Sequence, residues 1–495
     1  MTLSATAMRR LPVTFLLLAA TAFLGAVGCD LSTGGSSPMD GPTGADASTD
    51  ATTGSDATTP AFDGGVDAPP ACSADLRTDP EHCGACNSPC RPSANERATC
   101  QAGTCIRECE TGFDRCAPAD AGLADAGPSA AFACTSVTSD SANCGSCGHS
   151  CLGGTCTAGV CNPVTFRTLD AGLPEGLTWD DDSDTLYWTV RNDPTAPGGT
   201  GVFGHSFARD VDTFAARNAN FIAALYRAGH LYVSESGIAN RILDYDVAAP
   251  PGTIPDTFAT NAQAAPDLAA DTTHLYWTVY DSNFESPADC SQQTVGSLLR
   301  RPLRPGMLET PTSYTTTSPR PFAVAVDGSD VFMSQLCTGH AVVRYSVGTM
   351  GNLPPPTIMS NAFQNPVDVA LYGNTLFVAD ATVTGSGGPT YGGLFRIIVP
   401  AASGTSAPER MTQGNSSPRR VAIDETDVYW TDEGVLGTSG ESEFGFVYKM
   451  ARGANALSPA TILARGQKSP RQIAVGRKAI AWVTRGDRTI HFLAK

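Results

Sequence analysis

The sequence predicts an all-β fold for most of the chain, and two observations carry this prediction. The first is composition, since 50 glycines and 35 prolines in 495 residues favour short strands joined by turns over long helices. The second is a repeat of roughly 45 to 55 residues that starts near Val164 and runs to the end of the sequence. Together they predict a series of small antiparallel sheets.

The N-terminus has the pattern of an export signal. Arg9 and Arg10 precede an apolar stretch, residues 11–24, that is too short to span a bilayer. Small residues then lead to Cys29, and the run Ala-Val-Gly-Cys resembles a bacterial lipobox, which implies a signal peptide over 1–28 and acylation of Cys29. An ordinary secretory signal cut near this point is the alternative.

Residues 29–71 are expected to form a lipid-anchored, disordered linker. The segment consists mainly of Gly, Ser, Thr, Ala, Pro and Asp and has no Lys or Arg, so it buries too little apolar surface to fold. We therefore expect contact with a membrane through the N-terminal lipid and a place in the cell envelope. The outer membrane or cell surface is favoured over the inner membrane, although Asp30 resembles an inner-membrane retention signal of enteric bacteria.

Two cysteine clusters within residues 72–161 repeat one another, with a linker at 117–133 between them. Both contain C-G-x-C-x3-C followed by a Cys-x4-Cys pair; the members are Cys72, Cys83, Cys86, Cys90, Cys100 and Cys105, then Cys134, Cys144, Cys147, Cys151, Cys156 and Cys161. An additional pair, Cys109 and Cys116, is expected to close the first unit. The even number of these cysteines, 14, in a chain expected to be exported predicts disulfides, but which cysteines pair is open.

The same spacing also permits a zinc or iron–sulfur ligand set, which the expected oxidising compartment disfavours. The two units resemble the small cysteine-rich repeats of bacterial surface proteins and of plant stigma-specific secreted proteins. That resemblance implies a role in interaction or spacing and implies no chemistry.

Residues 162–495 are predicted to form a β-propeller, because each repeat supplies up to four short strands. The core of each repeat is an apolar triplet, a turn and an aromatic-rich second strand. The second strands are expected at Tyr187–Val190, Leu231–Val233, Tyr276–Val279, Val331–Met333, Leu376–Asp380, Tyr429–Asp432 and Ala481–Thr484. Seven units are countable. The last unit lacks a fourth strand, and residues 164–169 are expected to supply it and close the ring.

These repeats resemble the YWTD propellers known from lipoprotein receptors, with the full motif only at Tyr429–Asp432. That family usually has six blades, so six remains an alternative to seven.

Candidate site residues follow from propeller geometry, because ligands usually meet the loops that lead into the innermost strands. Those positions hold Glu175, Asp267, Asp368, Arg419, Arg420 and Arg471. They predict a mouth that is acidic on one side and basic on the other, suited to a zwitterionic or peptide-like ligand. The alternative is mutual neutralisation at a solvated rim. Cys290 and Cys337 follow the second strands of adjacent blades and are expected to form a disulfide.

Other residue patterns favour structural roles. The five tryptophans are periodic, which favours core packing over a sugar platform. The aspartates that follow first strands are expected to cap turns, with a cation ring as the alternative; they are Asp180, Asp271, Asp327 and Asp424. His205 and His340 are the best candidates for lyase chemistry, yet the histidines are not expected to converge on the mouth.

The sequence thus favours a non-catalytic, surface-tethered recognition or scaffold lipoprotein with an unknown protein, peptide or glycan partner and no cofactor or metal. The acidic balance, 32 Lys plus Arg against 49 Asp plus Glu, argues against nucleic acid. A propeller lyase or hydrolase acting on envelope glycans or peptides is the alternative function. A purely structural envelope component is a third.

Overall fold

The computed structural model describes residues 73–116 and 133–495, the latter with gaps at 194, 218, 238, 251, 263–264, 281–294, 304–309, 338, 348–355, 382, 386–387, 391, 401–405, 413–416 and 435–443. The predicted signal peptide, Cys29, the linker 29–71, Cys72 and Cys290 lie outside the described residues, as does nearly all of the linker at 117–133. The described residues form strands and turns and contain no helix. None of them therefore belongs to a helix long and apolar enough to cross a membrane.

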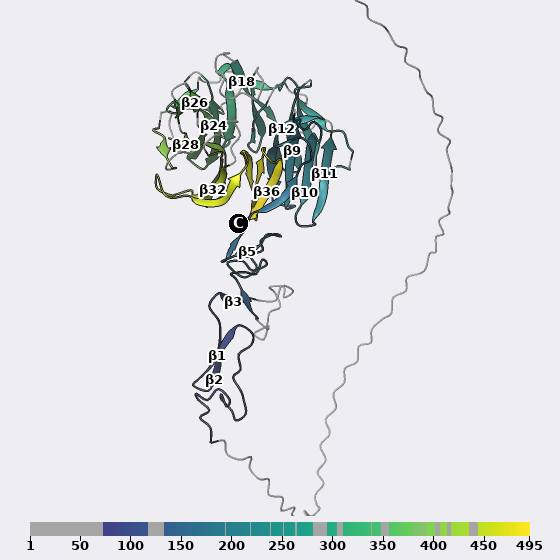
Figure 1. Ribbon diagram of the computed structural model, residues 1–495. Coiled ribbons are helices and arrows are strands. Elements are labelled where there is room, and N and C mark those ends of the chain that lie inside the picture. The colour runs from purple at the N-terminus through teal and green to yellow at the C-terminus, as the bar shows by residue number, and fades with distance from the viewer. Residues whose placement is uncertain are drawn as a thin grey trace, which may run out of the picture. The chain divides into compact units, whose positions relative to one another are not determined.

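Seven four-stranded antiparallel sheets form a β-propeller, which confirms the predicted fold and favours seven blades over six (Figure 1). The first strands of neighbouring sheets contact each other around the ring, and the first strand of the last blade contacts the first strand of the first blade. The first three blades contain β8 (Leu173–Asp180), β9 (Thr185–Arg191), β10 (Gly201–Ser206) and β11 (Val211–Arg217); β12 (Asn220–Arg227), β13 (His230–Ser236), β14 (Ile242–Asp246) and β15 (Asp256–Ala259); β16 (Leu268–Ala270), β17 (His274–Tyr280), β18 (Val295–Pro302) and β19 (Thr312–Pro319).

Blades four to seven continue the same order. They contain β20 (Pro321–Val326), β21 (Asp330–Gln335), β22 (Val342–Ser346) and β23 (Thr357–Ser360); β24 (Pro366–Tyr372), β25 (Thr375–Asp380), β28 (Gly393–Ile398) and β29 (Glu409–Arg410); β30 (Pro418–Ile423), β31 (Asp427–Asp432), β32 (Gly445–Ala451) and β33 (Thr461–Gln467); β34 (Pro470–Val475), β35 (Ala479–Thr484), β36 (Thr489–Ala494) and β7 (Val164–Thr168). A small hairpin of β26 (Val383–Gly385) and β27 (Gly388–Thr390) interrupts blade five.

The ring closes as the sequence predicts, because the N-terminal strand β7 pairs with β36 as the fourth strand of blade seven. Thr168 lies opposite Thr489, and Val164 lies opposite Phe492. Phe166 of β7 packs edge-on against Trp188 and Phe492, which ties the strand to blades one and seven. The pairing covers an edge of β36 that would otherwise be open.

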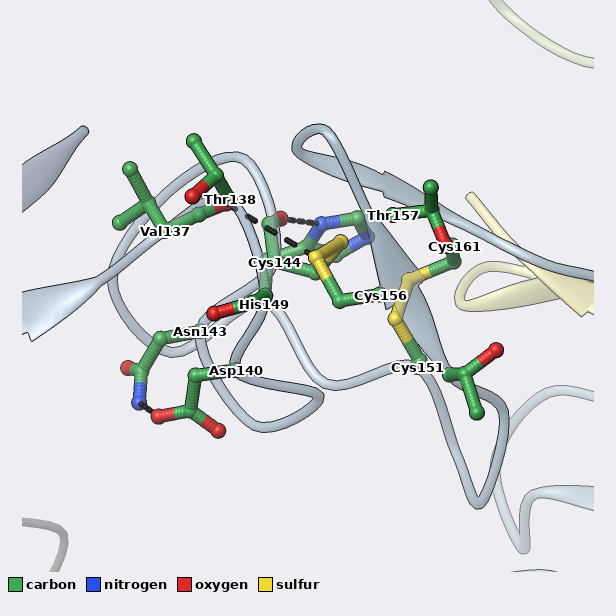
Figure 2. The surroundings of a disulfide bond; sticks show 12 residues. Val137, Thr138, Asp140, Asn143, Cys144, His149, Cys151, Cys156, Thr157 and Cys161 are labelled. Atoms are coloured by element: carbon green, nitrogen blue, oxygen red, sulfur yellow. Dashed lines mark hydrogen bonds between the residues drawn. A yellow bond between two sulfur atoms is a disulfide. The ribbon is translucent and has the colours of Figure 1, made fainter.

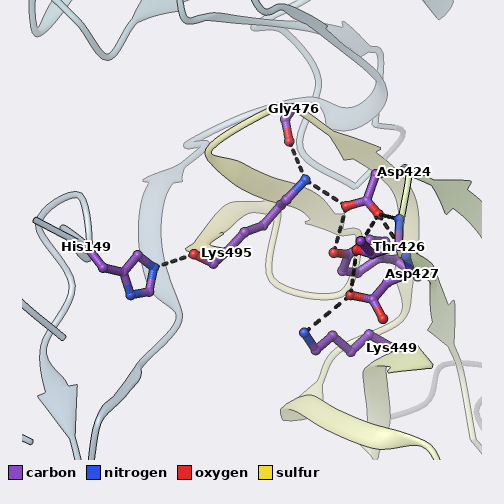
Figure 3. Close-up of polar contacts among 8 residues, drawn as sticks. His149, Asp424, Thr426, Asp427, Lys449, Gly476 and Lys495 are labelled. Atoms are coloured by element: carbon purple, nitrogen blue, oxygen red, sulfur yellow. Dashed lines mark hydrogen bonds and ion pairs between the residues drawn. The ribbon is translucent and has the colours of Figure 1, made fainter. Parts of the chain in front are cut away.

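The tryptophans and turn aspartates take the structural roles that the sequence predicts. Trp188, Trp277, Trp430 and Trp482 are at most 1% exposed, so they pack in the core. Each first-strand aspartate accepts hydrogen bonds from backbone amides of its turn, as Asp424 does from Thr426 and Asp427 (Figure 3). The other three turns repeat this capping.

The cysteine-rich module contains three short hairpin pairs: β1 (Glu96–Gln101) with β2 (Thr104–Cys109), β3 (Phe113–Cys116) with β4 (Ala133–Ser136), and β5 (Cys156–Thr157) with β6 (Val160–Cys161). The two repeats share one disulfide pattern. Cys83–Cys100 and Cys90–Cys105 in the first repeat correspond to Cys144–Cys156 and Cys151–Cys161 in the second. Figure 2 shows the cysteines of the second repeat. These cysteines are therefore paired with each other and are not a metal-ligand set, although Cys144, Cys151 and Cys161 lie close together.

The prediction that Cys109 and Cys116 close the first unit is wrong. Cys109 bonds to Cys134 and Cys116 bonds to Cys147, so both bridges join the first repeat to the second. The strands explain this: β3 pairs with β4 and places Cys116 opposite Ala133, beside Cys134. Spacing within one repeat carries no information about such pairing between repeats.

These two bridges predict how the module responds to cleavage. A protease site placed within residues 117–132 should nick the chain without releasing the N-terminal part, because Cys109–Cys134 and Cys116–Cys147 still connect the fragments. Electrophoresis with and without reductant measures this: one band should appear without reductant and two with it. Separation of the fragments without reductant would contradict the connectivity.

The second repeat also contacts the propeller around the C-terminal strand. The ring nitrogen Nε2 of His149 is hydrogen-bonded to the carbonyl of Lys495, whose Nζ bonds Asp424 at 2.7 Å (Figure 3). Cys151 and Cys161 share a buried cluster with Leu493. Both contacts lie at the end of the blades where first strands finish, since Asp424 directly follows β30.

Candidate functional site

A cavity of about 110 Å³ opens where the first strands begin. Its lining residues are Glu175, Gly176, Ile222, Ala223, Ala224, Pro266, Asp267, Phe322, Val367, Arg419, Arg420, Arg471, Gln472 and Arg485. They come from all seven blades. Five of the six predicted rim residues are among them, and the sixth, Asp368, is hydrogen-bonded to Arg420 at 3.1 Å.

β-Bulges in the first strands supply much of this lining. In six blades the pairing between first and second strand shifts register just after the strand begins, as between Pro174 and Leu177 or between Pro470 and Ile473. A bulge bends the strand and redirects side chains, which presents Glu175, Arg419 and Arg471 to the cavity. At Gly176 any Cβ would lie 2.7 Å from the backbone nitrogen of Ala224, so only glycine fits there.

Hydroxyl groups on the second strands hold neighbouring bulges together. Thr189 accepts a hydrogen bond from the amide of Gly176 at 2.8 Å and donates one to the carbonyl of Ile222 in the next blade at 3.0 Å. Ser234 bridges Ala223 and Ala265 in the same way. Thr431 donates to the carbonyl of Arg471 at 2.6 Å and so positions a cavity residue.

Removing one of these hydroxyls should destabilise the ring. Thr431→Val preserves shape but leaves the buried carbonyl of Arg471 without this donor, so we expect a loss of about 1–3 kcal/mol in the free energy of unfolding. Thr431→Ser keeps the hydroxyl and should recover most of that loss. Urea unfolding measures both variants, and equal stability of the two would contradict the bridging role.

One side of the cavity carries an excess of arginine. Glu175 accepts bonds from Arg191 at 2.6 Å and from Arg485 at 2.5 Å. Glu433, which is 1% exposed, pairs with Arg419 and with Arg471, the latter at 2.7 Å. Among the described residues, Glu175 and Glu433 are thus each paired with two guanidinium groups.

The pKa values on this side reflect both burial and pairing. Burial acts to raise the pKa of Glu175, but Arg485 and Arg191 lower it below its ordinary value. Burial lowers the pKa of Arg471 to about 9, with Arg419 and Arg485 adding to the effect and Glu433 opposing it. Both residues are therefore charged at neutral pH.

The opposite side carries two aspartates and one arginine. Asp368 accepts a bond from the amide of Val421 at 2.7 Å and pairs with Arg420. Asp267 accepts a bond from the amide of Val324 at 2.8 Å. Burial raises the pKa of Asp267 to about 7; Asp368 adds to this, and Arg420 opposes it. Asp267 therefore titrates near neutral pH.

The raised pKa of Asp267 predicts a pH-dependent stability. The unfolded carboxyl titrates near pH 4, so between about pH 4 and 7 the folded protein binds more protons, and stability should fall as pH rises. Asp267→Asn should flatten this fall, although the neighbouring Asp368 contributes too, since burial also raises its pKa. Thermal melts from pH 4.5 to 8 measure the slope, with the exposed Asp182→Asn as control. An unchanged slope in Asp267→Asn would contradict the assignment.

The structure brings the predicted rim residues together but distributes their charges differently. Glu175 was expected on the acidic side, yet it lies between two arginines. The rim is also not solvated, because Glu175 and Asp368 are each 6% exposed. Sequence reasoning missed Arg191, Glu433 and Arg485. Arg191 ends a second strand, and Glu433 and Arg485 directly follow second strands. Because first and second strands are antiparallel, second strands end where first strands begin, as the pairing of Leu173 with Arg191 shows.

The residues considered for other chemistry lie elsewhere. His205 lies on β10 and contacts Asp212 at 3.0 Å, and His340 precedes β22; neither lines the cavity. Cys337 is buried and disulfide-bonded. Its predicted partner Cys290 is outside the described residues, so that pairing stays a prediction.

The fold and site define a class: a seven-bladed β-propeller preceded by a disulfide-rich module. No family model matches the chain, and no curated protein matches it. Similar solved structures include the Kuenenia stuttgartiensis hydrazine synthase (12% identity, TM-score 0.47, 67% of this chain and 98% of that chain). Another is a catalytically inactive virginiamycin B lyase from Staphylococcus aureus with quinupristin (13%, 0.45, 68% and 98%). A third is the Cps50 (Swd1) β-propeller domain from Myceliophteria thermophila (12%, 0.45, 67% and 98%). These likenesses concern the fold alone.

Proposed function

We propose that this chain is an exported, envelope-tethered recognition protein whose propeller binds its partner at the central cavity. The observation that carries the proposal is the cavity itself, where charged side chains from several blades converge at one end of a rigid ring. Convergent polar groups in a concave site are typical of ligand binding. Among the described lining residues none is a histidine, cysteine, serine or threonine, which disfavours a lyase that uses a histidine and a hydrolase that uses one of these nucleophiles.

The chain enters the propeller at the end of the blades that lies away from the cavity. The chain reaches the propeller at Val164, which lies opposite Phe492 near the end of β36. First strands begin at the cavity, and β7 begins at the other end of the blades. The lipidated Cys29, the envelope location and the resemblances to YWTD propellers and stigma-specific repeats are parts of this proposal.

A thermal-shift screen tests the proposal. The oxidised chain is heated with envelope glycans, muropeptides, short peptides and divalent ions, with and without EDTA. A ligand at 100 times its dissociation constant adds about 2.7 kcal/mol to stability, which is resolvable. A shift that Asp368→Asn or Arg420→Gln weakens would support binding at the cavity. A shift lost with EDTA, accompanied by turnover, would favour the enzyme. No shift with any ligand would favour a purely structural component.

A further inference from the structure

We infer that the central cavity recognises a carboxylate group, borne by a small organic acid or by the C-terminus of a peptide, through Arg419, Arg471 and Arg485. This inference rests on the proposed function and adds the chemical class of the ligand. It follows from three features of the cavity. These are its charge balance, the arginine N–H groups that no described residue uses as hydrogen-bond donors, and its volume and apolar side chains.

The charge balance favours an anion. Arg419, Arg471 and Arg485 line the cavity, and Arg191 stands behind Glu175. Among the described residues, the three lining arginines pair with only two glutamates, Glu175 and Glu433, so these pairs leave one positive charge unbalanced. The carboxylates on the far side are paired with Arg420 or titrate near neutral pH. An entering anion would therefore meet a net positive surface in a site shielded from bulk water.

The arginines also retain donors. Arg471 and Arg485 each bond a glutamate through Nη2, and Arg419 does so through Nε and Nη2. Within the described part of the chain, no hydrogen bond uses Nη1 of these three residues. Guanidinium donors match the geometry of carboxylate oxygens, and such charge-assisted bonds are about twice as strong as neutral ones. The shared glutamates meanwhile fix the guanidinium groups in place.

Volume and wall chemistry limit what the carboxylate can carry. The cavity measures about 110 Å³, which is below the roughly 150 Å³ of a cavity that accepts benzene. The facing blades present apolar side chains beside Asp267 and Arg420, namely Ile222, Ala223, Phe322 and Val367. A carboxylate with a short aliphatic group therefore fits both the volume and these side chains.

Calorimetric titration of the full oxidised chain with matched acids and amides tests the inference. The pairs are isobutyrate with isobutyramide, and a short peptide with a C-terminal alanine as free acid and as amide. At least one acid should bind about tenfold or more tightly than its amide. The first pair reports a free acid and the second a peptide terminus.

Two variants locate the contact. Arg471→Gln should weaken acid binding about tenfold, whereas Arg477→Gln in the same blade should not, because Arg477 is 65% exposed and pairs with Asp182. If Arg471→Gln fails to fold, Gln472→Glu adds a negative charge to the lining without removing an arginine and should weaken acid binding as well.

The outcomes separate this inference from the function on which it rests. Equal binding of acids and amides, or unchanged acid affinity in Gln472→Glu, would overturn carboxylate recognition. If acids fail to bind while cationic or neutral ligands shift the melting temperature, the cavity is still a binding site but its ligand class is wrong. Failure of every ligand class would count against the proposed function itself.

Discussion

Replacing Glu433 with glutamine is expected to destabilise the propeller by about 3–5 kcal/mol. The carboxylate is 1% exposed, pairs with Arg419 and Arg471, and accepts a hydrogen bond from Ser469 at 3.1 Å. A neutral amide cannot balance two buried guanidinium groups, and the uncompensated charge of the arginines accounts for most of the loss. Chemical denaturation of the purified chain gives the difference in free energy of unfolding.

The matched control is Asp182→Asn, which removes an exposed ion pair with Arg477. Pairs of this kind contribute about 0–1 kcal/mol because water screens both charges, so this variant should be nearly as stable as the parent. A loss below about 1 kcal/mol in Glu433→Gln would show that the arginines can neutralise or reorient, and the charge balance drawn for the cavity would then be wrong.

Removing β7 is expected to have the second large effect. Residues 162–495 contain β7 and should unfold in one transition, whereas residues 170–495 lack it and leave β36 as an open outer edge of blade seven. The shorter chain should lose cooperative unfolding and aggregate. Calorimetry and light scattering of the two chains measure this.

A peptide of residues 162–169 provides a further check, because an extended peptide can add a strand to an exposed sheet edge. It should restore part of the cooperative transition to residues 170–495. Identical melting of the two chains without the peptide would contradict closure of the ring through β7.

The sequence predicts the fold well because the repeat encodes it locally. Each unit carries its own turn signals and its own buried second strand, as with Asp424 and Trp430 in blade six. The count of strands at the chain ends then determines how the ring closes, and β7 pairs with β36 accordingly.

The candidate site is only partly predictable for a physical reason. Residues that lead into first strands, such as Arg471, can be placed because strand order fixes one end of each blade. Their partners, such as Glu433 and Arg485, follow second strands, and the return of those strands to the same end must be considered as well. A charged residue directly after a Trp-Thr-Asp or Trp-Val-Thr segment is the signal that would have identified these two.

The disulfides between the repeats show a different limit. The repeat symmetry correctly identifies Cys83 and Cys144 as equivalent positions, and likewise Cys100 and Cys156. The disulfide Cys83–Cys100 in the first repeat therefore corresponds to Cys144–Cys156 in the second. Cys109 and Cys116 have no counterpart after the second repeat, so internal symmetry says nothing about their partners. Only the pairing of β3 with β4 brings the first repeat's last cysteines to the second repeat.

Site-specific photo-crosslinking in intact cells tests whether the partner binds at the cavity. A photoreactive amino acid at Gln472 lies in the cavity lining, and one at Lys478 lies at the other end of blade seven, where the side chain is 63% exposed. Binding at the cavity predicts an adduct from position 472, reduced by Arg471→Gln, and none from position 478. An adduct from position 478 alone would contradict it and would place the partner on the opposite face of the propeller.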